Sequence, residues 1–204
     1  MSIYDLSPEI SEKMTVYKNK AGNLPKMKVI RTIKEVANES RIDIYLHTGS
    51  HVDAPYHFLE KGKTIEKASL DKFMGKAIVL DFTKIKDSIN KKILLKKNFF
   101  ADDIVLLKTR NKTLKKFDFK FTYLEKSGAE YLVSKKIKAV GIDSLSVERG
   151  QHDYGTHKIL LRNNIPIFEG LNLSKVRQGR YIFYGFPLKI RKGEASPVRA
   201  VLIG

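Results

Sequence analysis

Apolar residues occur in short runs along this chain, and polar or charged segments separate the runs. Residues 77–82, 104–107 and 139–142 are runs of this kind. Short apolar runs bounded by polar residues predict buried β-strands. None approaches the roughly 18 consecutive apolar residues that a membrane-spanning helix requires, so no membrane partner is expected.

Further elements are predicted between and after these runs. Charged and apolar residues alternate at 41–46, as in a half-buried strand. Thr122 followed by Glu125 forms a capping box, which predicts a helix from there to about residue 135. The remaining predicted elements are a helix after Gly155 and Thr156 at 157–162, an extended segment at 165–168, and strands at 181–184 and 198–203.

Many strands with few helices between them predict a mixed α/β or α+β domain. The sequence shows no internal repeat, no low-complexity tract and no Pro/Gly/Ser-rich linker. Its 204 residues, of which 42% are hydrophobic, are enough to bury a core. We therefore expect a single domain over residues 1–204.

The first residues, MSIYDLSPEI, lack the basic head and apolar run of a signal peptide. Cysteine is absent, which excludes disulfides and thiolate metal ligands. Together these features lead us to expect a cytoplasmic protein.

The formal net charge is +17 at pH 7, and lysine dominates it, since only nine of the 39 cationic residues are Arg. A nucleic-acid surface would explain the charge and would use nearby aromatic rings for stacking, namely Phe99, Phe100, Phe117, Phe119 and Phe121. Specific readout favours Arg over Lys, however, and no nucleic-acid motif is present. We therefore predict a lysine-rich solvated surface and no specific nucleic-acid partner, with a basic RNA-binding protein as an alternative.

Histidines are concentrated in one short segment. The chain has five, and His47, His51 and His57 fall within eleven residues together with Asp53. These four positions share one parity, so an extended backbone would direct their side chains to one face, although glycine and proline interrupt the segment. A single histidine is usually a satisfied core or surface residue. Three histidines and an aspartate on one face instead indicate a site for Zn²⁺, Mn²⁺ or Fe²⁺.

Two later residues complete this pattern. His157 falls in the first turn of the predicted helix, and Glu169 lies just beyond the following extended segment. This order brings both to one edge of a sheet, where open α/β folds bind their ligands. Neither residue would indicate a metal site by itself.

Residues 47–58, His-Thr-Gly-Ser-His-Val-Asp-Ala-Pro-Tyr-His-Phe, closely resemble the signature His-x-Gly-Thr-His-x-Asp-x-Pro-x-His-Phe of the cyclase/kynurenine formamidase-like hydrolases. Ser50 replaces the usual Thr and keeps the hydroxyl. Similarity to other family segments extends over nearly the whole chain, at residues 4–7, 141–146, 157–171, 187–189 and 196–200.

The resemblance implies an α/β domain of the swivelling β/β/α type that binds up to two divalent ions per chain, Zn²⁺ or alternatively Mn²⁺. His47, His51 and Asp53 match the positions that bind the first metal. Asp53, His157 and Glu169 match the positions around the second. We also expect a homo-oligomer, either a dimer or a tetramer.

The implied activity is hydrolysis of a small amide. A metal lowers the pKa of bound water toward ~7, and the resulting hydroxide attacks a polarised carbonyl. His57 matches the acid/base that passes the proton to the leaving nitrogen, whereas His152 matches no motif position and is expected in a loop. The expected small-molecule substrate is an aryl formamide such as N-formylkynurenine, or a cyclic amide. A family member that binds metal without turnover is the alternative.

Overall fold

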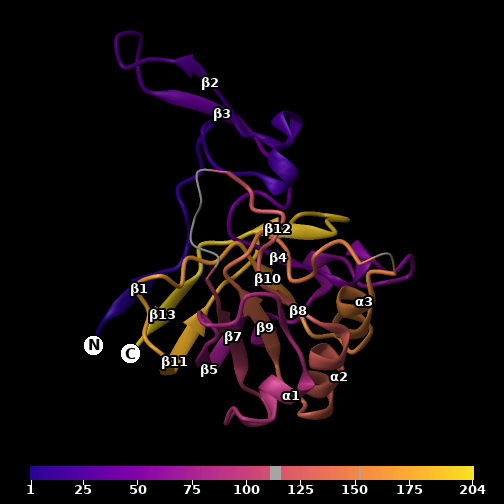
Figure 1. Cartoon of the computed structure of the whole chain (residues 1–204). Coiled ribbons are helices and arrows are strands. Elements are labelled where there is room, and N and C mark those ends of the chain that lie inside the picture. The colour runs from indigo at the N-terminus through magenta and orange to yellow at the C-terminus, as the bar shows by residue number, and fades with distance from the viewer. Residues whose placement is uncertain (111–115, 152) are drawn as a thin grey trace.

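The computed structural model describes residues 1–110, 116–151 and 153–204. Within these residues a mixed sheet of nine strands has the order β1-β13-β11-β5-β7-β9-β10-β4-β12 (Figure 1). Its strands are β1 (Ile3–Asp5), β4 (His51–Asp53), β5 (Met74–Asp81), β7 (Ile104–Lys108), β9 (Ala139–Ile142), β10 (Ile167–Glu169), β11 (Gly179–Tyr184), β12 (Ala195–Pro197) and β13 (Val201–Ile203). The predicted α/β class is confirmed.

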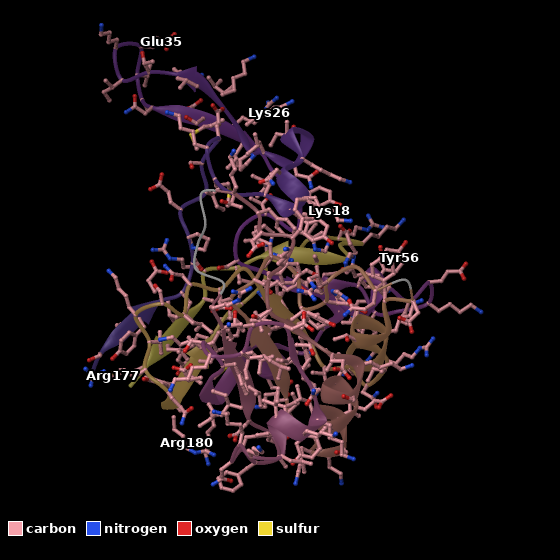
Figure 2. All side chains as sticks on the ribbon, in the orientation of Figure 1. Lys18, Lys26, Glu35, Tyr56, Arg177 and Arg180 are labelled. Atoms are coloured by element: carbon pink, nitrogen blue, oxygen red, sulfur yellow. The ribbon has the colours of Figure 1, made fainter. Side chains whose placement is uncertain are left out.

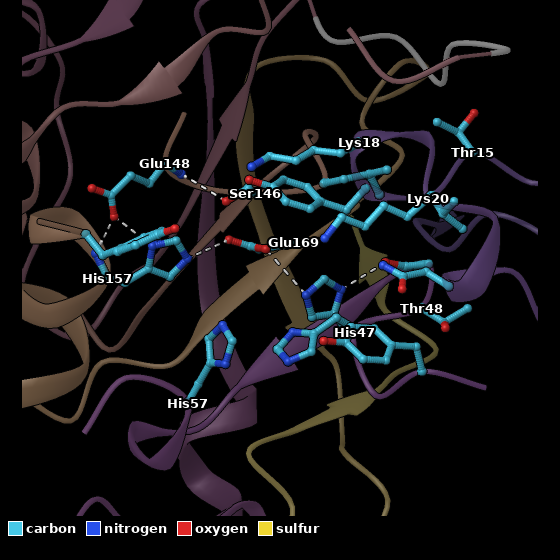
Figure 3. Close-up of a pocket in the computed structure, with 18 of the residues that line it drawn as sticks. Thr15, Lys18, Lys20, His47, Thr48, His57, Ser146, Glu148, His157 and Glu169 are labelled. Carbon is cyan, nitrogen blue, oxygen red and sulfur yellow. Dashed lines mark hydrogen bonds and ion pairs between the residues drawn. The ribbon is translucent and has the colours of Figure 1, made fainter. Parts of the chain in front are cut away.

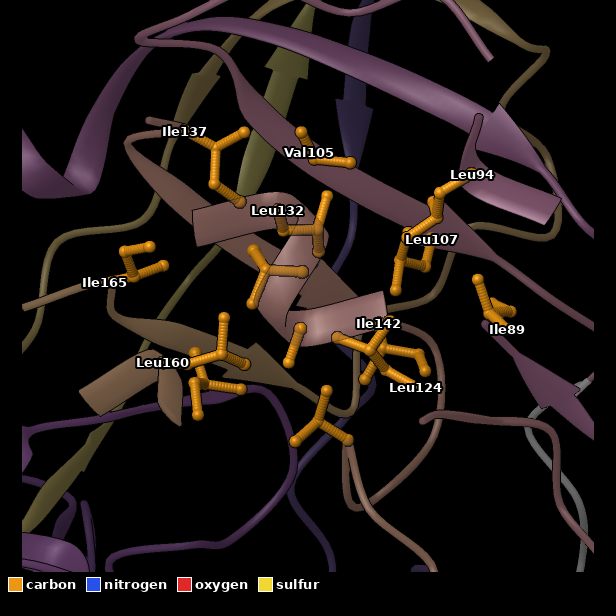
Figure 4. Packing of buried hydrophobic residues seen from close by; sticks show 14 of the residues in the cluster. Ile89, Leu94, Val105, Leu107, Leu124, Leu132, Ile137, Ile142, Leu160 and Ile165 are labelled. Carbon is orange, nitrogen blue, oxygen red and sulfur yellow. The ribbon is translucent and has the colours of Figure 1, made fainter. Parts of the chain in front are cut away.

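Four parallel strands, β5, β7, β9 and β10, form the centre of the sheet. Both faces of these strands are covered, which explains why their residues are apolar without alternation. Along β7, Val105 and Leu107 pack into one core cluster, and Ile104 and Leu106 pack into the other. The helices α1 (Lys91–Leu94), α2 (Lys126–Ser134) and α3 (Gly155–Arg162) contribute residues to the first cluster, part of which Figure 4 shows.

The antiparallel strands β4 and β12 extend the sheet beyond β10. β4 pairs on both sides and is buried along its whole length. The β4–β10 register places His51 opposite Glu169 and Asp53 opposite Ile167. Residues two apart on a strand share a face, and so do residues directly opposite each other. His51, Asp53 and Glu169 therefore project from the same face of the sheet.

Strands β2 (Lys26–Arg31) and β3 (Glu39–Asp43) pair with each other and form an arm, residues 26–43, that projects from the body (Figure 1). Every residue of both strands is exposed. The strand predicted at 41–46 is therefore found only over 41–43, and the prediction that it is half-buried is wrong. The alternation is real, since Met27 lies opposite Ile42, but both side chains are exposed and nothing in the described part of the chain buries them.

The helix predicted from Thr122 begins later than expected. Residues 123–124 form the short strand β8 (Tyr123–Leu124), which pairs with β6 (Ser88–Ile89). The Thr122 hydroxyl donates a hydrogen bond to the carbonyl of Ile85, so the predicted capping box is wrong and α2 follows Glu125. The second predicted helix is confirmed, because α3 includes all of 157–162.

The phenylalanines of the lysine-rich region divide between the core and the surface. Phe99, Phe117 and Phe121 are buried, whereas Phe100 and Phe119 are exposed. A buried ring cannot stack on a base, so three of the five rings serve the fold. Charged side chains occur on the arm and on the body alike, as Lys26 and Arg177 illustrate in Figure 2. No helix in the described residues is long and apolar enough to cross a membrane.

Candidate metal centre

His51 is buried in β4, and its surroundings fix which ring nitrogen carries the proton. Its Nδ1 lies 3.0 Å from the carbonyl oxygen of Gly49. A carbonyl can only accept, so Nδ1 donates, and Nε2 is the ring nitrogen that can offer its lone pair to a metal ion or to a second proton. Nε2 lies 3.4 Å from Glu169 and 3.6 Å from Asp53. An imidazole lone pair directed at two carboxylates has the arrangement of a metal ligand.

His157 lies in the first turn of α3 and is oriented by Glu148. Oε2 of Glu148 lies 2.7 Å from Nδ1 of His157 and accepts a hydrogen bond of 3.1 Å from its backbone N–H. Nδ1 therefore donates, and Nε2 faces Glu169 at 3.4 Å and Asp53 at 3.9 Å. Sequence reasoning missed Glu148, because an acid nine residues before a histidine has no helical or strand periodicity that would link the two.

The charges of this cluster support one another. Burial by itself lowers the pKa of His157, but hydrogen bonds to Glu148 and Glu169 raise it to about 10. The same competition raises the pKa of His51, where Glu169 and Asp53 outweigh burial. Burial raises the pKa of Glu169, but the two histidines hold it well below its usual range. Both Nε2 positions therefore favour a positive charge, and metal binding there must displace protons.

His47 and His57 reach the same region from outside β4. His47 lies in a turn between β3 and β4, with Nδ1 3.1 Å from Oδ1 of Asp53. His57 ends the 3-10 helix η3 (Pro55–His57), and its ring centroid lies 4.3 Å from that of His47. The parity argument would need an extended backbone, but only 51–53 form a strand, and turns bring in the outer histidines. Burial lowers the pKa of His57, so its ring is neutral at pH 7.

A divalent cation fits this set of donors. Both carboxylate oxygens of Asp53 and Nε2 of His51 are buried without a hydrogen-bond partner in the described part of the chain. A buried carboxylate that accepts no hydrogen bond is costly even beside histidines, and a bound cation offsets that cost. Two groups of residues have donor atoms within 4.8 Å of one another, namely His47 with Asp53 and His57, and His51 with Asp53 and Glu169. Asp53 belongs to both groups, as expected for two neighbouring ions, and the geometry admits His57 as a ligand as well as an acid/base.

The donors other than Asp53 line a cavity of about 480 Å³. Aromatic side chains form part of its wall, namely Tyr17, Tyr45, Phe58 and Tyr154. The Phe58 ring lies 4.5 Å from the ring of His157 and 5.1 Å from that of Tyr154. In Figure 3 the labelled histidines face a common space beside Glu169. A cavity of this size and composition can hold a small organic molecule with an aromatic ring.

Backbone contacts hold the His51 end of β4 against β10. The Ser50 hydroxyl donates a hydrogen bond of 2.8 Å to the carbonyl of Gly170, which explains why position 50 keeps a hydroxyl. Gly170 has φ +66°, and a Cβ there would lie 2.3 Å from the carbonyl oxygen of Gly49. That oxygen is the acceptor that orients His51. Only glycine allows this approach.

Comparison with known proteins identifies the family. The sequence matches the putative cyclase family over residues 4–149. The chain belongs to the cyclase family. Its similarity to cyclase-like protein 3 of Oryza sativa subsp. japonica is 34% identity over 179 residues, which cover 82% of this chain and 66% of that protein. Its similarity to the kynurenine formamidase of Bacillus cytotoxicus is 28% identity over 203 residues, covering 97% of this chain and 95% of that protein.

A solved structure gives the same result for the cyclase fold. A potential metal-dependent hydrolase with cyclase activity is 39% identical to this chain and superposes with a TM-score of 0.92. The match covers 98% of this chain and 96% of that one. The predicted family and fold are therefore both confirmed.

In this cyclase-family chain the structure brings all the predicted site residues to one place: His47, His51, Asp53, His57, His157 and Glu169. Their roles as ligands and as acid/base stay predictions. His152, which was expected in a loop, lies outside the described residues. Besides Glu148, sequence reasoning missed the N-terminal residues 15–20, most of which line the cavity, because no motif connects them to the histidine segment.

Proposed function

We propose that the protein is a metal-dependent hydrolase that cleaves a small amide, either an aryl formamide such as N-formylkynurenine or a cyclic amide. The main support is the convergence of two imidazole lone pairs on two buried carboxylates in an aromatic-lined cavity. The kynurenine formamidase and the metal-dependent hydrolase among its relatives, both matched over nearly the whole chain, support the same reaction class.

The residues that would hold divalent ions, Zn²⁺ or alternatively Mn²⁺, are His47, His51, Asp53, His157 and Glu169. A bound ion of this kind lowers the pKa of a water molecule and polarises the carbonyl of the substrate. Glu148 keeps the proton of His157 on Nδ1, and the carbonyl of Gly49 does the same for His51, so that both Nε2 atoms stay available. Preset lone pairs of this kind reduce the reorganisation that binding requires.

Proton transfer falls to His57. Its ring is neutral at pH 7, because burial lowers its pKa, and can accept a proton at a ring nitrogen. The same ring, once protonated, can donate to the leaving nitrogen of the amide. The adjacent Phe58 and the nearby Tyr154 offer an aromatic surface to an aryl group.

A combined metal and substrate experiment tests this proposal. Purified protein should contain up to two transition-metal ions per chain, and chelation should abolish hydrolysis until Zn²⁺ or Mn²⁺ is restored. His51→Ala should lower metal occupancy, whereas Glu130→Ala, which changes an exposed acid of α2, should not. kcat/KM is then compared across formamides, lactams and lactones. No metal and no rescue would contradict the proposal, and full metal occupancy without turnover of any substrate would favour the non-catalytic alternative.

We also propose that the protein is a homo-oligomer that pairs through the arm. An isolated two-stranded hairpin is marginally stable in water, and the apolar side chains of Met27, Val29 and Ile42 are exposed on this one. The arm also carries both signs of charge, including the ion pair of Arg31 with Glu39 at 3.4 Å. Two copies related by a two-fold axis can therefore match apolar and charged groups with each other.

Sedimentation velocity tests the oligomer. The wild type should sediment as a dimer or larger, and the double variant Val29→Lys/Ile42→Lys should sediment as a monomer with an unchanged far-ultraviolet circular dichroism spectrum. A wild type that is monomeric at micromolar concentration would contradict this proposal.

A further inference from the structure

Most of residues 15–20 line one wall of the cavity, and the fold holds this wall in place. Tyr17 packs edge-on against Phe117, with ring centroids 5.0 Å apart. The side-chain oxygen of Asn19 accepts a hydrogen bond of 2.9 Å from the backbone N–H of Phe117. Phe117 is itself buried. The wall is therefore fixed to the body by contacts between segments that lie far apart in sequence.

Lys18 and Lys20 extend from this wall into the mouth of the cavity (Figure 3). The Lys18 ammonium lies 5.3 Å from the centroid of the Tyr17 ring, a cation–π contact that restrains it. The two acids that line the cavity, Glu148 and Glu169, are directed at histidines. Neither lysine forms an ion pair with these acids or with any other carboxylate in the described part of the chain. Two positive charges at the mouth therefore have no protein counter-ion.

The backbone of this wall also has an unusual conformation. Lys18 and Asn19 both have φ +54°, the left-handed region that residues with a Cβ rarely adopt. Asparagine tolerates this region because its short side chain can form local hydrogen bonds, whereas a lysine side chain does not stabilise it in this way. Tertiary contacts must therefore impose the conformation, and it carries the Lys18 side chain toward the cavity.

We infer that Lys18 and Lys20 bind a carboxylate of the substrate, so that the preferred substrate is an anionic amide. This inference rests on the proposed function and narrows its substrate class. Both lysines are exposed, whereas His51 and Glu169 are buried, so the carboxylate lies at the outer end of the molecule and the scissile amide at the inner end. An aryl ring between the two ends would contact the aromatic side chains that line the cavity. The substrate class is therefore an aryl amide that carries a carboxylate away from the scissile bond.

Matched substrates and matched variants test this inference in the metal-loaded protein. Formanilide and 3-formamidobenzoate differ only in the carboxylate. The variant Lys18→Met/Lys20→Met removes both charges but keeps unbranched side chains of similar length. The control Lys91→Met/Lys92→Met removes two exposed charges from α1, which lies at the opposite end of the body from β4 (Figure 1).

The wild type should prefer 3-formamidobenzoate, and the double variant at 18 and 20 should lose about tenfold in kcat/KM on that substrate, mainly through KM. Its loss on formanilide should stay under about twofold, and the α1 control should lose under about twofold on both substrates, since surface charges of this kind contribute little. Equal losses on both substrates, or no loss on the anionic one, would overturn the inference.

A binding measurement separates failure of this inference from failure of the proposed function. If the wild type hydrolyses neither substrate, the formamide form of the proposed function fails, and calorimetry with 3-aminobenzoate and aniline replaces the kinetic measurement. Weaker binding of 3-aminobenzoate by the variant at 18 and 20, with the α1 control unchanged, would support the lysine site on its own. Equal binding by all three proteins would overturn it.

Discussion

Replacing Glu148 by Gln tests how the protein prepares His157 for a metal. One oxygen of Glu148 lies 2.7 Å from Nδ1 of His157 and also accepts from the backbone N–H of this residue. Gln keeps the size of the side chain and one accepting oxygen, but it removes the negative charge. The hydrogen bond to Nδ1 therefore changes from a charge-assisted bond to a neutral one.

The expected loss follows from this change. A charge-assisted hydrogen bond is about twice as strong as a neutral one, so His157 loses roughly 1–2 kcal/mol of orientation energy. Partners of this kind typically change metal affinity by about 10–100-fold. Glu148 also raises the pKa of His157, which reaches about 10, so Glu148→Gln weakens the competing proton as well. A divalent ion feels a neighbouring charge with twice the energy that a proton does, so the ion loses more. We expect a net loss of about tenfold in Zn²⁺ affinity at pH 7, and a larger loss at pH 9, where fewer protons compete.

Competition against a chromophoric chelator measures this affinity at both pH values. Glu130→Gln in α2 is the matched control, because it removes the same charge from an exposed position. Thermal unfolding of the metal-free proteins checks that the variant keeps its fold. An affinity for Zn²⁺ that is unchanged at both pH values would refute the role given to Glu148.

Three further changes probe the site and its support. His57→Ala should keep its metal and lose about 10²–10⁴-fold in kcat if His57 is the acid/base, whereas loss of metal by elemental analysis would make it a ligand. Burial raises the pKa of Asp143 to about 7 despite hydrogen bonds from Thr109, above its ordinary 3.8. The folded state therefore binds the extra proton, and the free energy of unfolding falls as pH rises from about 4 to about 7. Asp143→Asn should remove this fall, which is on the order of 4 kcal/mol at most. The measurement is urea unfolding of both proteins across this pH range, with chelator present to keep them metal-free. The same dependence of the midpoint on pH in both proteins would contradict the explanation. Gly170→Ala should lower the free energy of unfolding several times more than Gly150→Ala does. Both glycines have positive φ, but only a Cβ at position 170 would clash with a backbone oxygen. Equal melting temperatures of the two variants would contradict this clash.

The central strands and the histidine segment could be predicted from the sequence for different reasons. The central parts of β5, β7 and β9, at 77–80, 104–107 and 139–142, are buried on both faces, which explains why they are continuously apolar. The histidine segment could be found because its ligands lie close together in sequence, and the family signature supplied His157 and Glu169. In the structure the segment is not extended, since turns on both sides of β4 bring in His47 and His57.

Other features left no trace that sequence reasoning could use. Glu148 and residues 15–20 reach the site through contacts between segments that lie far apart in sequence. Such contacts produce no periodic pattern of residues that could be recognised in the sequence. The alternation at 41–46 has the pattern of a half-buried strand, but it belongs to an arm whose apolar side chains stay exposed. The prediction that a helix begins at Thr122 was wrong because the next two residues form β8 and pair with β6.

The position of β4 has a consequence for how the protein folds. Residues 51–53 are made well before both strands that pair with them, at 167–169 and 195–197. Contacts between residues so far apart in sequence slow folding, because the intervening chain must be ordered first. The strand that carries His51 and Asp53 therefore lacks both partner strands until residues 167–197 have emerged from the ribosome. The group of donors at His51, Asp53 and Glu169 can therefore form only after residue 169 has been made, and a chain that is cut off before residue 195 lacks β12, the strand that pairs with the outer edge of β4.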